Sequence, residues 1–282
     1  MKRIQVGCEF RYTSTWPTPA TVLVQSHGEG AHRLRHESWE TGGLPLHAFI
    51  DLYGNRCQRV ILPEGDSVLR YEALVDVPAE TEDVDAHATQ ARVEDLPDDV
   101  LVYTLPSRYC FSDQLSSAAW EFFGGTEPGW ARVQAVCDWI HENIIYGHEY
   151  QSTPLTTAVD IYEARAGVCR DFAHLGVTFC RALNIPARYV FGYMPDIDIA
   201  PPYPAMDFHA WFEVYLSGRW WTRDARFNVP RIGRIPVGRG RDAVDVAMIT
   251  SYGPAQFLSM TVVADEVAAP TPVVATESKG AT

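Results

Sequence analysis

The sequence predicts an α+β protein, in which an all-β N-terminal region precedes a region of helices followed by antiparallel strands. Three observations support this class. Apolar and polar residues alternate along most of the first eighty residues, and no helical period competes there. Between residues 112 and 183, apolar residues recur at intervals of three and four, which is typical of helices. From residue 188 onward, the chain returns to short β-rich runs separated by turn signals.

The N-terminal region is predicted to form a small antiparallel sheet or sandwich. Cys8, Phe10 and Tyr12 alternate with charged residues, which is the pattern of a half-buried strand. A turn signal, Tyr53-Gly54-Asn55, separates two later β-rich runs and indicates a hairpin. We therefore assign residues 1–99 to an N-terminal β-sandwich-like domain with an acidic linker. Its further β-rich runs lie at residues 20–25, 46–52, 57–62 and 69–77.

The acidic linker occupies residues 78–99 and has no clear period. It contains eight acidic side chains, and Arg92 is its single arginine or lysine. Like charges repel one another, so such runs are usually solvated surface. We interpret the linker as an exposed crossing between two domains and assign it no functional role.

Four helices are predicted before the chain returns to strands. Ser112-Asp113 can cap the first helix, and Thr157 with Asp160 forms a capping-box pattern at the start of the third. The fourth helix is expected to stop before Pro186, which cannot continue it. The four helices are expected at residues 112–123, 130–144, 157–166 and 169–183.

The fourth helix carries a cysteine in its first turn. Val168, Phe172 and Leu175 belong to an apolar stripe, and small residues form a second stripe beside it, so the helix is predicted to be mostly buried. Cys169 is then close to unpaired N–H groups and to the positive end of the helix dipole, which favour a thiolate. One interpretation is a nucleophile at the end of a rigid helix. The alternative is a buried structural cysteine, the commoner fate of this residue.

Two strands supply a candidate base and a carboxylate to orient it. The run 209–216 alternates cleanly, Ser217-Gly218 is a two-residue hairpin signal, and 219–224 returns antiparallel. In that register His209 and Asp224 share a face, one diagonal step apart, within reach of a hydrogen bond. Such an imidazole can take a proton from a thiol and return it to a leaving amine. The alternative is that a strand-edge histidine and a surface carboxylate share a face by chance, because side chains alternate between the two faces of a sheet.

The remaining segments are predicted from composition. Residues 195–207 contain four prolines and three aspartates and are expected to form a loop beside the base. In the Gly, Pro and Arg-rich stretch 230–240, we favour surface or salt-bridging arginines over an anion pocket. A last strand is expected at 257–263. We assign residues 100–265 to a second domain and residues 266–282 to a disordered tail.

Composition and charge argue against several function classes. The net charge of −13 disfavours nucleic acid and anionic membrane surfaces as partners. No apolar run approaches the roughly 20 residues that a membrane span needs, and the first residues lack a signal-peptide core, so a cytoplasmic protein is predicted. None of the six cysteines has a zinc-ligand spacing, and neither disulfides nor a metal or other cofactor is expected.

Several motifs, in order along the chain, resemble the transglutaminase-like superfamily, and most closely its bacterial cysteine-protease-like branch. They are Gly167-Val168-Cys169-Arg170-Asp171-Phe172-Ala173, Arg181-Ala182-Leu183-Asn184-Ile185-Pro186-Ala187-Arg188, His209-Ala210-Trp211 and Asp224. The resemblance covers roughly residues 1–265. It implies a papain-like core, in which helices pack on an antiparallel sheet, and a metal-independent triad. By this resemblance Cys169 is the nucleophile, His209 the general base and acid, and Asp224 the residue that orients the imidazole.

The same resemblance implies a thioester intermediate, whose oxyanion would be held by the backbone N–H of Cys169 and one further donor. Candidates for that donor lie in the loop before the third helix: Tyr146, Gln151 and Ser152. The predicted function is amide-bond hydrolysis, as a peptidase or amidase acting on a peptide or protein. Transfer of the acyl group to an amine is the alternative reaction, and a non-catalytic scaffold that retains the fold is the alternative class.

The chain also departs from the pattern of this superfamily. Where many relatives carry Asp-Pro-Thr-Asn after the second strand, this chain has Asp224-Ala225-Arg226-Phe227. The carboxylate is kept, but the substrates of better-studied members do not carry over. The acidic loop 195–207 would border the cleft and predicts a preference for cationic or amine-bearing groups. His174, on the buried helix, is interpreted as a core histidine rather than a second base.

Overall fold

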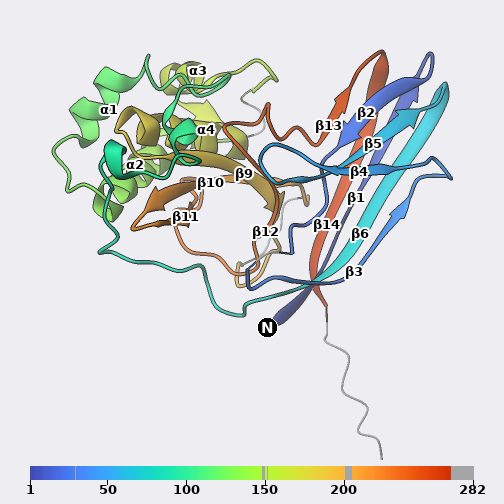
Figure 1. Ribbon diagram of the computed structural model, residues 1–282, viewed down its shortest axis with the longest axis horizontal. Helices are drawn as coiled ribbons and strands as arrows, with labels where there is room; N and C mark the ends of the chain where they lie inside the picture. The colour runs from blue at the N-terminus through green and yellow to red at the C-terminus, as the bar shows by residue number, and fades with distance from the viewer. Residues whose placement is uncertain (29, 148–149, 151, 201–204, 268–282) are drawn as a thin grey trace, which may run out of the picture.

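The computed structural model describes residues 1–28, 30–147, 150, 152–200 and 205–267, and its elements form two bodies (Figure 1). One body is a sandwich of two antiparallel sheets, and the other is an antiparallel sheet covered by helices. The predicted α+β class is therefore confirmed. One hydrophobic core fills the sandwich and extends to the second sheet, and another lies between that sheet and the helices.

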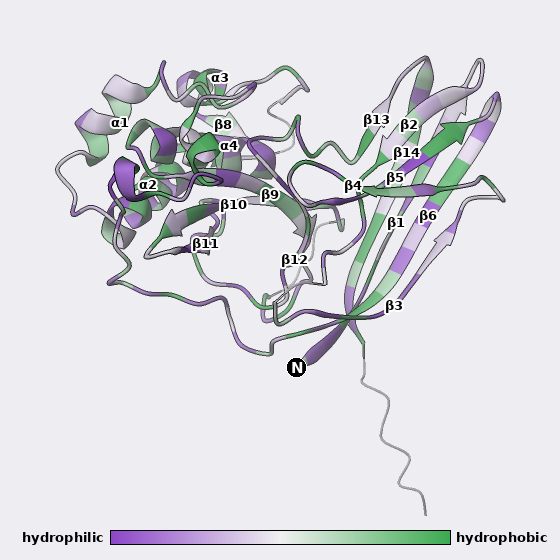
Figure 2. Ribbon diagram, in the orientation of Figure 1, coloured by the Kyte–Doolittle hydropathy of each residue, from purple (hydrophilic) through white to green (hydrophobic). Residues whose placement is uncertain are grey.

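The sandwich has the strand orders β14-β1-β6-β3 and β13-β2-β5-β4. Hydrophobic and hydrophilic residues alternate along its long strands (Figure 2), and the predicted inward residues Cys8 and Phe10 are buried. Period-two alternation places every second side chain in the core between the sheets. The strands are β1 (Lys2–Ser14), β2 (Thr18–Val22), β3 (Arg33–Glu40), β4 (His47–Ile50), β5 (Arg56–Leu62), β6 (Gly65–Val77), β13 (Ile249–Ser251) and β14 (Ala255–Val267).

Two strands of the sandwich come from the last third of the chain. β14 pairs with β1 along most of its length, with Val262 opposite Cys8, and β13 pairs with β2. The predicted strand 257–263 is the centre of β14, but we had assigned it to the second domain, whereas its hydrogen bonds are made to the N-terminal sandwich. The assigned tail also begins inside β14, which ends at Val267. The rest of that tail lies outside the described residues.

The second body has the strand order β11-β10-β9-β12. The first helix begins at Ser116, one turn later than predicted, and β12 falls in the stretch 230–240 for which we predicted no strand. The strand was not predicted because this stretch contains residues that are rare in strands, namely Pro236, Gly238 and Gly240. The elements are η1 (Val93–Asp95), η2 (Leu101–Thr104), α1 (Ser116–Phe123), α2 (Trp130–Asn143), β7 (Ile145–Tyr146), α3 (Ala158–Ala164), β8 (Ala166–Gly167), α4 (Cys169–Ala182), β9 (Ala187–Tyr193), β10 (His209–Leu216), β11 (Arg219–Arg223) and β12 (Ile235–Gly240).

Helix α4 is the buried centre of this body, as predicted. All of its residues from Asp171 to Ala182 are buried. The stripe of small residues lets the helix approach β10 closely, because a Cβ on Gly176 would lie 2.5 Å from the ring of Phe212. At its start, a carboxylate oxygen of Asp171 accepts the N–H of Val168 at 2.9 Å and closes the first turn. The position of Cys169 is therefore fixed by both packing and capping.

The linker 78–99 runs from the end of β6 along the second body to the helices (Figure 1). We predicted an exposed crossing, and most of its acidic residues are indeed exposed. It is nevertheless attached to the second body along its length. The N–H of Ser217 donates to the carbonyl of Thr89 at 2.9 Å, and the amide of Gln90 donates to the carbonyl of Leu183 at 3.0 Å.

Gly192 is the point of closest approach between β9 and β12. A Cβ added there would lie 2.1 Å from the carbonyl oxygen of Ile235, a backbone atom that cannot rotate away. We expect Gly192→Ala to lower the free energy of unfolding by about 1–3 kcal/mol, because β12 must move off β9. Thermal denaturation measures this loss. Gly125→Ala, where nothing lies within 4 Å of the added Cβ, is the control. Equal melting temperatures for the two variants would contradict the close packing.

Candidate active site

Cys169, His209 and Tyr146 line one cleft of about 190 Å³. They come from the start of α4, the start of β10 and the end of β7. Helix α4 packs against β10, and Cys169 and His209, forty positions apart in sequence, line the same cleft. The backbone N–H of Ala210 lowers the pKa of the Cys169 thiol, so the sulfur lies near the residue that directly follows His209.

His209 is hydrogen-bonded to Asp224, with 2.8 Å between Nε2 and Oδ2, and both side chains are buried. The predicted hairpin register is confirmed, because Leu216 lies opposite Arg219 and the pairing continues to the end of β11. An ionised carboxylate can only accept hydrogen bonds, so Nε2 carries the proton of the neutral ring. Nδ1 then carries the lone pair, which accepts a long hydrogen bond of 3.5 Å from Nη1 of Arg226.

Asp224 is held by cations and donors from the segment that follows it. Arg234 donates from Nη2 to Oδ2 at 2.7 Å, and the backbone N–H of Arg226 donates to Oδ1 at 2.9 Å. Burial alone would raise the pKa of Asp224, but Arg234 and His209 together hold it well below its usual range. We expected salt-bridging arginines in this stretch without naming a partner. Arg234 could not be placed from sequence, since it directly precedes β12, the strand that we missed.

Burial disfavours the charged forms of both the thiol and the imidazole. Burial raises the pKa of the Cys169 thiol to about 11, and the Ala210 N–H and Arg226 oppose this only in part. Burial also lowers the pKa of His209, against the opposite effect of Asp224. The thiolate expected at the helix N-terminus is thus not confirmed, because lost hydration outweighs the nearby donors. Such a thiol becomes a strong nucleophile only when a base removes its proton.

Two of the three positions that depart from the relatives, Arg226 and Phe227, line the cleft. The guanidinium of Arg226 lies 3.7 Å from the ring centroid of Tyr146, and its Nη1 lies 3.5 Å from Nδ1 of His209. The ring of Phe227 is 5.3 Å from the imidazole. Asp207, from the acidic loop, lines the same cleft. Charges of both signs therefore border the site, and the expected preference for cationic groups stays a prediction.

The three predicted oxyanion donors have different surroundings. Tyr146 lines the cleft with Cys169. The hydroxyl of Ser152 accepts a hydrogen bond from the guanidinium of Arg170. Gln151 lies outside the described residues. Tyr146 is therefore the candidate whose position fits the role best, because a donor must reach the oxygen of a carbonyl bound next to the sulfur.

His174 has the surroundings of a core histidine, as interpreted from the sequence. Its Nε2 accepts the N–H of Ala243 at 3.1 Å, and its ring packs between those of Tyr109 and Tyr189. Complete burial lowers its pKa well below the usual value. Among the residues that the structure describes, no group of three or more His, Cys, Asp or Glu side chains could hold a metal ion.

The comparisons with known proteins agree with this geometry. A family model of the transglutaminase-like superfamily matches residues 117–225, which include Cys169, His209 and Asp224. A solved structure from Cytophaga hutchinsonii, provisionally described as a cysteine protease, is 33% identical and has a TM-score of 0.84, over 96% of this chain and 92% of that chain. This chain belongs to the transglutaminase-like superfamily. The resemblance inferred from the motifs is therefore confirmed, and this transglutaminase-like protein belongs to a family of cysteine-based enzymes.

Curated relatives of this transglutaminase-like chain match it over shorter spans. An uncharacterized protein of Mycobacterium leprae is 35% identical over 124 residues, which are 41% of this chain and 42% of its own length. An uncharacterized protein of Mycobacterium tuberculosis is 37% identical over 109 residues, 34% of this chain and 33% of its own. The matched region is thus less than half of these relatives. In the described parts of this chain, no helix is both long and apolar enough to cross a membrane.

Proposed function

We propose that this protein is a cysteine-dependent amide-bond hydrolase, a peptidase or amidase that acts on a peptide or protein. One observation carries the proposal. Cys169 and His209 meet in a single cleft, and the imidazole is bonded at 2.8 Å to the buried carboxylate of Asp224. A thiol, a base in the correct tautomer and an orienting carboxylate are the parts that acyl transfer to sulfur requires.

The proposed reaction proceeds in two stages. As the sulfur of Cys169 attacks the substrate carbonyl carbon, Nδ1 of His209 takes the thiol proton, and Asp224 stabilises the imidazolium. The tetrahedral intermediate collapses when the C–N bond breaks, and the imidazolium gives its proton to the leaving amine. The product is a thioester on Cys169 and a free amine. Water, deprotonated by the same imidazole, then hydrolyses the thioester and restores the thiol.

Two parts of the proposal concern the oxyanion and the acceptor. The backbone N–H of Cys169 and the hydroxyl of Tyr146 are the proposed donors to the oxyanion, because Tyr146 lines the same cleft as Cys169. An amine in place of water in the second stage would give a new amide, so hydrolase and transferase share the acyl-enzyme. The choice depends on which acceptor the cleft admits.

The experiment is to trap the acyl-enzyme. The protein is mixed with p-nitrophenyl acetate, quenched in acid at short times and digested for mass spectrometry. We expect a burst of nitrophenol and an acetyl group on Cys169 that hydroxylamine removes. The five other cysteines, all buried, serve as internal controls. A folded protein that stays unacetylated at Cys169 would support the scaffold alternative. If cadaverine diverts most of the acetyl group into an amide, the protein is a transferase.

The domain bounds, the location, the partners and the substrate stay predictions. The proposed catalytic domain spans residues 100–265 and follows an N-terminal domain of residues 1–99, although β13 and β14 complete the sandwich of the latter. A cytoplasmic location and the absence of nucleic acid or membrane partners are expected from composition alone. The substrate within the peptide or protein class is open, because Arg226 and Asp207 give the cleft both signs of charge.

A further inference from the structure

Arg234 lies between two carboxylates from distant parts of the chain. Its Nη2 is 2.7 Å from Oδ2 of Asp224, and its Nε donates to Oε1 of Glu82. Only 4% of the Arg234 side chain and 4% of the Asp224 side chain are exposed, so the pair is shielded from water and salt. The pairing of β12 with β9 fixes the arginine, which directly precedes β12. Glu82 comes from the acidic linker, to which we had assigned no function.

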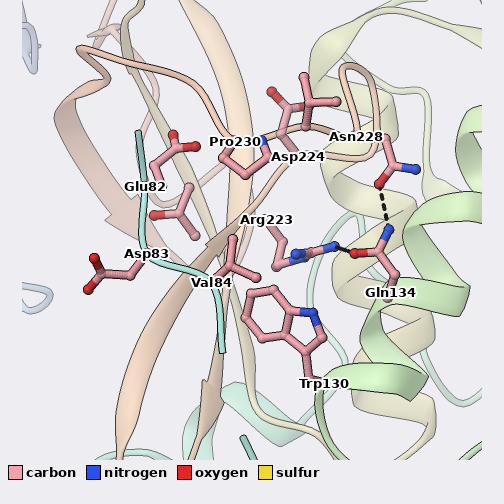
Figure 3. A pocket seen from close by; sticks show the side chains of 11 residues that line it. Glu82, Asp83, Val84, Trp130, Gln134, Arg223, Asp224, Asn228 and Pro230 are labelled. Carbon is pink, nitrogen blue, oxygen red and sulfur yellow. Dashed lines mark hydrogen bonds between the residues drawn. The ribbon is translucent and has the colours of Figure 1, made fainter. Parts of the chain in front are cut away.

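Glu82 is itself fixed in place. Its Oε2 accepts the backbone N–H of Arg231 at 2.6 Å, and its own N–H donates to the carbonyl of Arg231 at 3.2 Å. With the bond to Arg234, this makes three polar contacts between one linker residue and the segment before β12. Glu82 and Asp224 also line one cavity of about 120 Å³, which Figure 3 shows between the linker and the side chains of Gln134 and Arg223.

We propose that Glu82 and Arg234 are positioning residues for the His209–Asp224 pair, so that the linker controls the charge around the catalytic base. This inference rests on the proposed function of that pair. The four groups form a row of imidazole, carboxylate, guanidinium and carboxylate. Arg234 aims Asp224 and keeps it ionised. Glu82 neutralises Arg234, so that the guanidinium does not oppose the imidazolium that forms during catalysis.

The sign of each charge gives opposite consequences for the two residues. Arg234 is a cation beside the pair and disfavours protonation of the imidazole. Glu82 is an anion that bonds to Arg234 and offsets its charge, so its expected effect on the pair has the opposite sign. Removing Arg234 therefore raises the pH at which the pair takes up a proton, and removing the charge of Glu82 lowers it. A purely structural role would move both variants in the same direction or leave the titration unchanged. Other charged or titratable groups in the described residues also act on the pair, namely Cys137, Tyr146, Cys169, Arg226 and Arg231, and Asp207 lines the same cleft.

The test uses iodoacetamide as a probe of Cys169, read by mass spectrometry of its peptide across pH. The alkylation rate of Cys169 is expected to fall at acidic pH, where the Cys169–His209 pair takes up its first proton. This fall is the acidic limb of the pH profile. In Arg234→Gln this acidic limb should move up by about one pH unit, as expected for a buried neighbouring charge. In Glu82→Gln, which keeps the acceptor for Arg231, the limb should move down by about half a unit.

The chain offers a matched control in the next linker residue. Asp83 pairs with Arg219 at 3.0 Å, but the two side chains are 70% and 53% exposed, so Asp83→Asn should leave the limb unchanged. Arg234→Lys keeps the cation and should hold the limb near its wild-type pH even if Arg234→Gln folds poorly. Shifts of one sign, or none, in Arg234→Gln and Glu82→Gln would overturn the inference. A Cys169 that titrates like an ordinary thiol, without an acidic limb, would instead overturn the proposed function.

Discussion

Replacement of Cys169 by alanine is expected to lower kcat/KM for amide hydrolysis by about four orders of magnitude or more. The acyl-enzyme cannot form without the sulfur, and the remaining groups can only polarise a bound substrate. Cys169 begins α4 and is only partly buried, so the loss of one sulfur atom should leave the melting temperature close to that of the wild type. The measurement is initial-rate hydrolysis of fluorogenic peptides, with release of the amine followed directly.

Two further cysteine variants make that result specific. Cys169→Ser keeps the shape of the side chain but offers a weaker nucleophile, and it should be nearly as inactive. Cys57→Ala removes a buried sulfur from the sandwich, away from the cleft, and should keep full activity. Substantial turnover by Cys169→Ala, or equal losses in both alanine variants, would rule out Cys169 as the nucleophile.

Replacement of Asp224 by asparagine is expected to lower kcat by about two to four orders of magnitude, with little change in KM. The carboxylate accepts the proton on Nε2 of His209 and so leaves the lone pair on Nδ1. An amide can donate to Nε2 instead, which places the ring proton on Nδ1, where it blocks transfer from Cys169. The substitution also removes the negative charge that stabilises the imidazolium and leaves Arg234 with Glu82 as its remaining carboxylate.

A nearby carboxylate serves as the control for this variant. Asp138 accepts hydrogen bonds from Gln134 and Asn228, whereas the carboxylate bonded to the imidazole is that of Asp224. Asp138→Asn should therefore retain most of the activity, and steady-state kinetics with a melting curve separates a chemical defect from misfolding. A rise in KM at constant kcat for Asp224→Asn would mean that Asp224 binds substrate rather than orients the base.

The parts of the site that were predicted correctly depend on local rules. The 3.6-residue period of the apolar residues predicts α4 and puts Cys169 at its start, and Pro186, which cannot continue a helix, predicts its end. The two-residue turn at Ser217-Gly218 fixed the hairpin register, and with it the approach of His209 to Asp224. These patterns act over fewer than twenty residues, so a single sequence contains the information that they need.

The parts that were missed depend on contacts between distant segments. The strand β12 exists because β9 pairs with it, although its own composition disfavours a strand. The partnership of Glu82 with Arg234 spans 152 positions, and no local pattern links them. The thiolate predicted for Cys169 stays unconfirmed for a related reason, since the burial that raises the pKa of its thiol depends on elements from across the chain.

The superfamily, the buried helix with its cysteine and the hairpin that joins imidazole to carboxylate could all be inferred from the sequence. Three other features require the fold: β14 closes the N-terminal sandwich, burial raises the pKa of the Cys169 thiol, and the linker supplies a carboxylate behind Asp224. The physical reason is that periodicity and turns follow from neighbouring residues, whereas hydration and electrostatic energy depend on every group that the fold brings near.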